Sequence, residues 1–280
     1  MFGVGGGLTR GGIRADADLV AHLGRITTSD STYIAAVTDL ILGLKEDSIW
    51  DSIGLLSVVA PTEADSLLNL KGTASDADSG KYGSPNFVAN QGFKMTTNNC
   101  INLGDGVTNL SNYDLSNGHW MFYTGQEPTD TDGQVYLIAN DYRTGSITSY
   151  FKYDKYMGGD ENEIFCIPGK SFAYSAILTE STHTLKGFIM GQTRTTSTDF
   201  VLNDTRYLTN TAGWGFYTEE NYPFVLGVEP DGTGGYTGQT ELAGVQFRAW
   251  SVGDDMGASN IALYENRIRT YMQAIGADSY

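Results

Sequence analysis

Short apolar runs separated by turn signals fill residues 54–253 and constrain the fold more than any other feature of this sequence. Runs of four to eight residues, such as GLLSVVAP, HWMFYTG, QVYLIAND and GVQFRAWSVG, alternate with polar, glycine-rich stretches. Short strands joined by tight turns are typical of an all-β domain, whereas a parallel α/β fold needs helices between its strands. The pattern therefore predicts two packed antiparallel sheets over residues 54–257.

Residues 29–53 follow a helical pattern instead. Their apolar side chains recur every three or four residues, and Ser29 or Asp30 can cap the first turn. Gly43 is expected to divide the segment into two short helices. We interpret this region as a small helical adaptor packed on one end of the β-domain.

The last segment, residues 258–280, is again helical. Ser259 or Asn260 can cap its start, apolar residues repeat at three and four, and Gly276 stands where a helix is expected to stop. A helix that follows a sandwich is expected to pack over one sheet or its edge.

Residues 1–28 differ from the rest of the chain. Six of the first twelve residues are glycine, so this segment lacks the side chains from which a core is built. Residues 1–26 carry a net charge of +1, against −17 for the remainder. Two interpretations stay open, a disordered tail and an extended arm that becomes ordered against another subunit; we favour the arm.

The overall charge argues against two classes of partner. Seventeen basic side chains stand against thirty-three acidic ones, a net charge of −16, which disfavours nucleic acid and anionic membranes. No apolar run reaches the ~18–20 residues of a transmembrane helix, and no signal peptide is recognisable. Cys100 and Cys166 are interpreted as buried free thiols of a chain assembled in a reducing cytoplasm, in preference to one disulfide.

Catalytic chemistry finds little support in the sequence. Glu161 and Glu163 would share one face of a strand, as the carboxylate pair of a glycanase could, but the preceding Met-Gly-Gly favours a solvated turn. His119, beside Trp120 in an expected strand, is interpreted as a structural histidine. We therefore expect no enzyme.

Acidic turns at residues 76–80, 130–133 and 254–255 could offer oxygen ligands to Ca²⁺. None continues into the twelve-residue EF-hand pattern with its closing Glu. They are interpreted as solvated turns, and no cofactor is expected.

An aromatic cluster is the one candidate for glycan binding, since sugars stack on exposed aromatic rings. Its members are Trp214, Tyr217, Tyr222 and Tyr236. Trp214, Phe216 and Phe224 also alternate as core residues do, and we favour the core for this region.

Several stretches, taken in order, resemble concanavalin A-like (laminin G-like) modules of tailed-bacteriophage virion structural proteins. The similarity spans about residues 44–277. It rests on IWD at residues 49–51, LLNLKG at 67–72, SPNF at 84–87, GF at 92–93, INLG at 101–104, and the closing MGASNIALYENRIRTYMQAIG. Each motif is unspecific by itself, and their order and spacing carry the resemblance.

The resemblance implies a jelly-roll sandwich in a virion: a capsid decoration, collar, tail or tail-fibre component assembled in the host cytoplasm. It implies a non-enzymatic protein whose N-terminal arm and helices bind other virion proteins or further copies in a homo-oligomer, leaving the sandwich exposed. The short arm favours a compact subunit over a long fibre. The alternative is a receptor-recognition module that binds a host surface glycan.

Overall fold

The computed structural model describes most of the chain from Asp16 onward. The described ranges are residues 16–72, 76–79, 83–95, 99–106, 117–126, 134–140, 150–154, 163–167, 176–179, 186–194, 197–203, 205–210, 223–226, 229–230, 236–237 and 244–278.

The first sheet has eight strands in the described part of the chain, all paired antiparallel in the order β12-β11-β10-β5-β16-β3-β2, with β1 also paired to β16. The strands are β1 (Ile53–Val58), β2 (Asn86–Val88), β3 (Gly92–Lys94), β5 (Gly118–Thr124), β10 (Gly187–Arg194), β11 (Ser197–Leu202), β12 (Thr205–Asn210) and β16 (Gln246–Asp254). Strand β16 is central, since it pairs with β5 on one edge and with both β1 and β3 on the other.

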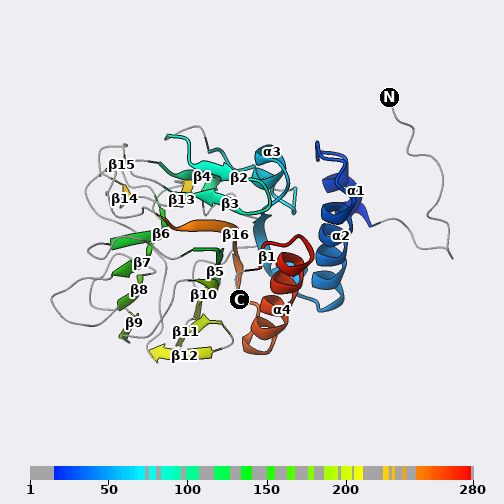
Figure 1. Ribbon diagram of the computed structural model, residues 1–280. Helices are drawn as coiled ribbons and strands as arrows, with labels where there is room; N and C mark the ends of the chain where they lie inside the picture. The colour runs from blue at the N-terminus through cyan, green and yellow to red at the C-terminus, as the bar shows by residue number, and fades with distance from the viewer. Residues whose placement is uncertain are drawn as a thin grey trace.

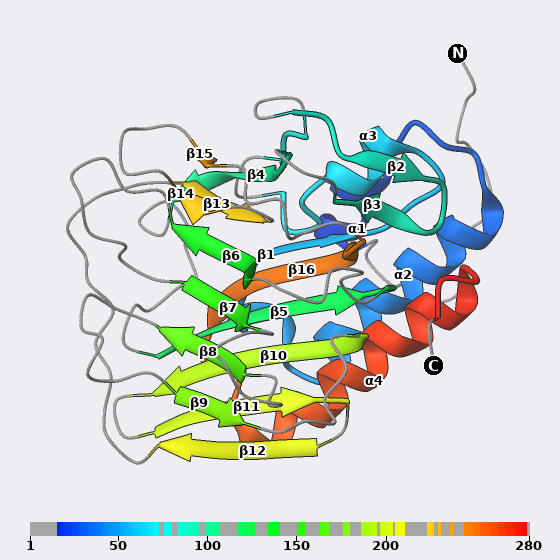
Figure 2. The ribbon, with the colours of Figure 1, turned by 60° about the vertical axis from the view of Figure 1, so that its left-hand side comes forward.

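The second sheet lies against one face of the first (Figure 2). Its described strands follow the order β4-β13-β6-β7-β8-β9 and are again antiparallel. They are β4 (Ile101–Gly106), β6 (Gln134–Asn140), β7 (Tyr150–Asp154), β8 (Glu163–Ile167), β9 (Ala176–Thr179) and β13 (Pro223–Leu226), and a separate ribbon joins β14 (Glu229–Pro230) to β15 (Tyr236–Thr237). The predicted antiparallel β-sandwich is confirmed.

Three helices cover the opposite face of the first sheet, so the molecule has a helical layer, a middle sheet and an outer sheet (Figure 1). They are α1 (Ala17–Leu23), α2 (Ser31–Glu46) and α4 (Ala258–Ala274). The closing helix α4 therefore packs over a sheet, as predicted.

Strand β5 shows why the middle sheet is apolar on both sides. Every residue from Gly118 to Thr124 is buried. Met121 and Tyr123 belong to the core shared with the helices, and because side chains alternate along a strand, Trp120 and Phe122 face the other sheet. A strand buried on both faces gives the continuous apolar run seen in the sequence.

Helix α2 begins as predicted, with the Asp30 side chain accepting hydrogen bonds from the backbone amides of Thr32 and Tyr33. The predicted division at Gly43 is wrong, because α2 continues to Glu46. A Cβ at Gly43 would collide with the Arg267 guanidinium of α4, so this glycine permits a close helix–helix contact. The expected second helix is only a 3₁₀ turn, η1 (Trp50–Ser52).

Helix α4 ends as predicted and begins differently. Gly276 has a φ of +71° just past the helix, the left-handed conformation that glycine adopts readily. Ser259 and Asn260 lie inside α4 and do not cap it, since the helix already begins at Ala258 after Gly257.

The expectation of an extended arm over residues 1–28 is wrong where it can be compared with the structure. Residues 1–15 lie outside the described part, but Ala17–Leu23 forms helix α1 with Asp16 as its cap. A short helix, α3 (Glu63–Leu67), also interrupts the run of expected strands. Strands β8 (EIFCI), β11 (STDFVL) and β12 (TRYLTN) were not among the apolar runs from which strands were predicted.

Candidate functional site: the helical face and its N-terminal strap

Residues 16–28, here called the strap, connect residues 1–15 to the body and are held there by polar contacts. At its first anchor, the Lys45 ammonium lies 2.7 Å from Asp16 Oδ2 and 2.5 Å from Asp18 Oδ2. Burial opposes ionisation of Asp16, yet the bonds from Lys45 and the Leu19 amide outweigh it, so the pKa of Asp16 is lowered. Asp16 thus both caps α1 and binds α2.

The indole of Trp50 completes this anchor. Its Nε1 donates to Asp18 Oδ2 at 3.0 Å, and the Lys45 and Lys71 ammonium groups lie 5.4 and 4.5 Å from its ring centre. Lys71 also donates to the Trp50 carbonyl oxygen at 2.6 Å. Burial lowers the pKa of Lys71, with Asp51 and Asp18 partly offsetting it. The IWD motif, through Trp50, and the LLNLKG motif, through Lys71, are therefore in contact with each other next to the strap.

His22 is the one α1 residue that is fully buried. Its Nε2 lies 3.3 Å from the Tyr33 hydroxyl of α2, while its Nδ1 has no hydrogen-bond partner among the described residues. Burial, aided by the nearby Arg25 charge, lowers the pKa of His22 to about 4, against an opposing effect of Asp65 and Asp76. The imidazole is therefore neutral at pH 7.

The second anchor lies at the other end of the strap. The buried Asp65 carboxylate accepts from the backbone amides of Thr27 at 2.7 Å and Thr28 at 3.0 Å. Arg25 pairs with Asp76 at 2.8 Å and also donates to the Asn69 carbonyl oxygen. The sequence analysis did not predict these anchors. The signal that could have indicated the first one was Asp16, a residue type that caps helices, three positions before Leu19.

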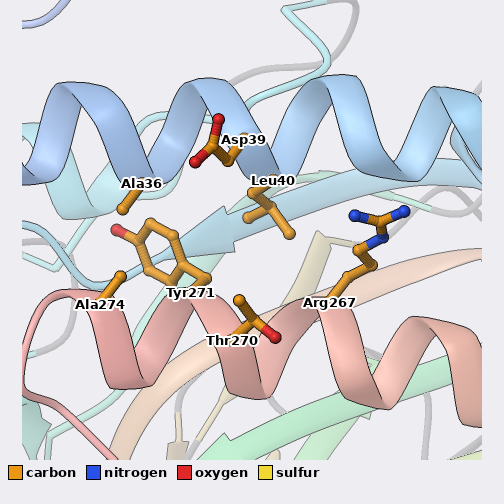
Figure 3. A pocket seen from close by; sticks show the side chains of 7 residues that line it. All are labelled: Ala36, Asp39, Leu40, Arg267, Thr270, Tyr271 and Ala274. Atoms are coloured by element: carbon orange, nitrogen blue, oxygen red, sulfur yellow. The ribbon is translucent and has the colours of Figure 1, made fainter.

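A small depression lies between α2 and α4 (Figure 3). It is lined by apolar side chains of Ala36, Leu40, Tyr271 and Ala274 and by polar side chains of Asp39, Arg267 and Thr270. Its volume of about 60 Å³ accommodates a few water molecules and is too small for a sugar ring. Arg267 is engaged with Asp47, Nε to Oδ2 at 2.7 Å, which ties α4 to the end of α2.

The structure leaves the aromatic glycan candidates untested. Trp214, Tyr217 and Tyr222 lie outside the described residues. Tyr236 begins β15, but its side chain is not among those described. Their role stays a prediction.

His119 is the structural histidine that the sequence predicted. It is buried in β5, with Nδ1 2.6 Å from the Asp254 carbonyl oxygen and Nε2 2.8 Å from the Ser251 hydroxyl. Because a carbonyl only accepts, Nδ1 carries the proton and Nε2 accepts from Ser251. Burial lowers the pKa of His119 to about 4.

The two cysteines are described unequally. Cys100 is buried next to β4. The side chain of Cys166, in β8, lies outside the described part, so the prediction about their pairing stays a prediction.

Two acidic turns considered for calcium have other roles in the structure. Asp76 accepts from Arg25 and from the Asn69 amide, both at 2.8 Å. Asp255 accepts from the Gln192 side chain and from the Gly257 amide. The turn at residues 130–133 lies outside the described residues, and the part of the chain that is described holds no cluster of three or more His, Cys, Asp or Glu suited to a metal.

The candidate carboxylate pair is likewise only half visible. Residue 161 lies outside the described part, whereas Glu163 is the first residue of β8, paired with Asp154 and Thr179.

Within the described helices, none is long and apolar enough to cross a membrane.

No family model matches the chain, and no curated protein matches it in sequence. Solved structures do match in fold. The binding domain of botulinum neurotoxin serotype D aligns with 77% of this chain at 11% identity and a TM-score of 0.50. The binding domain of botulinum neurotoxin DC in complex with SialylT aligns with 78% at 8% identity and a TM-score of 0.50. Trypanosoma rangeli sialidase aligns with 88% at 11% identity and a TM-score of 0.49.

The likeness to the two toxin binding domains defines a class of fold, the β-sandwich of concanavalin A type, here with a helical layer on one sheet. The chain spans about half the length of the toxin binding-domain chains, 52%, and 40% of the sialidase. At identities this low, the likeness extends to the fold alone.

Proposed function

We propose that this chain is a non-enzymatic structural subunit of a bacteriophage virion, attached through its N-terminal segment, with the sandwich exposed. One observation carries the proposal: the strap ties the start of the described chain to the helical face, on the side of the middle sheet opposite the outer sheet (Figure 1). The first described residue, Asp16, is therefore fixed on the helical face, away from the outer sheet.

Charge supports attachment by this segment. Residues 1–15 contain Arg10 and Arg14 and no acidic residue, whereas the chain as a whole has a net charge of −16. A cationic, glycine-rich segment suits an acidic surface on another virion protein or on a further copy of this chain.

Deletion of residues 1–15 tests the proposal, because it leaves Asp16 and the strap in place. The truncated protein is expected to fold with an unchanged Tm and to lose incorporation into particles. A matched control replaces residues 1–15 by a glycine–serine sequence of equal length, which keeps the reach and removes the arginines and apolar side chains. Normal incorporation of the truncated protein would contradict the proposal.

Glycan recognition is the second candidate function. The observation that favours it is the fold shared with a toxin binding domain solved in complex with SialylT. In this chain the glycan would be a host surface polysaccharide, and the aromatic cluster that includes Trp214 would hold it by stacking.

A glycan array with residues 16–280 tests this candidate, since α2 forms part of the core and the strap packs against it. Selective binding that Trp214→Ala abolishes, with an unchanged circular dichroism spectrum, would favour recognition. The same protein incubated with bacterial polysaccharide is expected to release no reducing ends, and their release would overturn the non-enzymatic assignment.

A further inference from the structure

The strap is held to the body mainly by polar groups. Helix α1 has seven residues, too few to be stable alone in water. The apolar side chains of the strap, Leu19, Leu23 and Ile26, are only partly buried against the core. The ion pairs of Lys45, the bonds to Asp65 and the burial of His22 therefore decide whether the strap stays bound.

His22 is the least satisfied of these groups. It is fully buried, and its Nδ1 has no hydrogen-bond partner among the described residues. Tyr33 faces it from α2, Asp65 from α3, Asp76 from the loop before β2, and Arg25 from the strap itself. A second proton on the ring would bring a charge into a buried site beside Arg25, and leaving the site would restore its hydration.

The Asp16 carboxylate of the strap responds to pH differently. The pKa of Asp16 is lowered by Lys45 and by the Leu19 amide, so its ion pair persists below the usual range of aspartate. Between pH 6.5 and about 4, protonation of His22 favours release of the strap.

The sandwich keeps a core of its own apart from these contacts. Strand β5 is buried along its whole length and β16 up to Gly253, whereas a short peripheral helix belongs to the part of a protein that opens at the lowest free energy.

We propose that residues 16–28 are an acid-released strap, which leaves the helical face as a unit at mildly acidic pH while the sandwich stays folded. Protonation of His22 controls the release. The inference rests on the proposed function, because release would lengthen the N-terminal segment available to a neighbouring virion protein by thirteen residues, 16–28.

Hydrogen exchange of the full chain at pH 7.0 and 5.0, corrected for chemical exchange rates, tests this directly. A histidine with a pKa of about 4 when bound and about 6.5 when released predicts a fall of about twentyfold in the protection of residues 17–23. Strands β5 and β16 are expected to stay far better protected than residues 17–23 at both pH values, although their protection also falls at pH 5 because His22 and His119 take up protons on global unfolding.

Two variants identify the titrating group. His22→Gln is expected to remove the pH dependence, and Asp65→Asn is expected to weaken protection at both pH values while keeping the fall. An unchanged protection of residues 17–23 in the native chain, a fall that persists in His22→Gln, or a protection of β5 that drops to the level of residues 17–23 at pH 5 would each overturn the proposal. The experiment uses the isolated chain, so its failure would leave particle attachment by residues 1–15 untouched.

Discussion

At the scale of single residues, close backbone contacts explain a glycine that the sequence pattern leaves unexplained. Gly253 in β16 lies where β1 begins, and a Cβ there would collide with the Ser52 carbonyl oxygen and approach the His119 ring at 2.7 Å. Glycine is required at this position by its neighbours in space, which belong to η1, β1 and β5.

Gly253→Ala is therefore expected to destabilise the protein by about 1–3 kcal/mol, since the backbone of the adjoining segment must shift. Urea denaturation at pH 7 measures the change. Gly24→Ala is the control, because Gly24 has an ordinary helical φ of −72° and a Cβ there would make only ordinary van der Waals contacts, the nearest at 3.4 Å; it should lie within about 0.5 kcal/mol of the native protein. Equal effects of the two substitutions would contradict the argument.

At the scale of elements, α4 is fastened to both of its neighbours by polar groups. Arg267 binds Asp47 at the end of α2, and the buried Tyr271 hydroxyl donates to the Val59 carbonyl oxygen just after β1 at 2.6 Å. The second contact joins the last helix, in the helical layer, to the end of the first strand, in the middle sheet.

Tyr271→Phe is expected to lower the free energy of unfolding by about 1–2 kcal/mol, because it leaves a buried carbonyl without this donor. Thermal and urea unfolding both report the change. Ala274→Ser, on the exposed side of the next turn, serves as the matched control and should be close to neutral. A Tyr271→Phe protein as stable as the native one would show that the hydroxyl bond contributes nothing.

At the scale of the whole molecule, the N-terminal region has two parts with different roles. Deletion of residues 1–15 should leave the unfolding free energy unchanged, whereas deletion of residues 1–28 exposes Tyr33 and Trp50 and removes the partners of Lys45. The longer deletion is expected to cost on the order of 1–3 kcal/mol and to lower Tm by several degrees. Calorimetry of both proteins checks this, and equal Tm values would contradict a structural role for the strap.

Global stability is also expected to depend on pH through His119. Its pKa in the folded protein is about 4, below the value of about 6.5 in the unfolded chain, so the unfolded state binds the proton first as pH falls. The contribution of His119 is complete above pH 6.5 and is lost progressively toward pH 4, by about 2 kcal/mol at pH 5. Urea denaturation at pH 7 and 5 measures it, and equal midpoints would contradict the prediction.

Much of the fold was predictable because its signals are local. The apolar runs that became β1, β5, β10 and β16 and the periodic helices α2 and α4 appear directly in the sequence. Strands β11 and β12 were missed, since β11 pairs with β10 and β12 with β11, and this pairing is not visible in their own composition. The extended arm was predicted where α1 lies, because a helix of seven residues is too short to show a clear periodicity.

By itself, the sequence determined an all-β sandwich with helical ends and a cationic, glycine-rich segment on an acidic chain, because composition and periodicity are properties of neighbouring residues. Only the tertiary structure decided that residues 16–28 bind the chain's own helical face. That outcome depends on Lys45, Asp65 and Tyr33, which lie between 11 and 38 residues away from their partners. No local pattern encodes which charges meet across such distances, because the packing of α1, α2 and α3 brings them together.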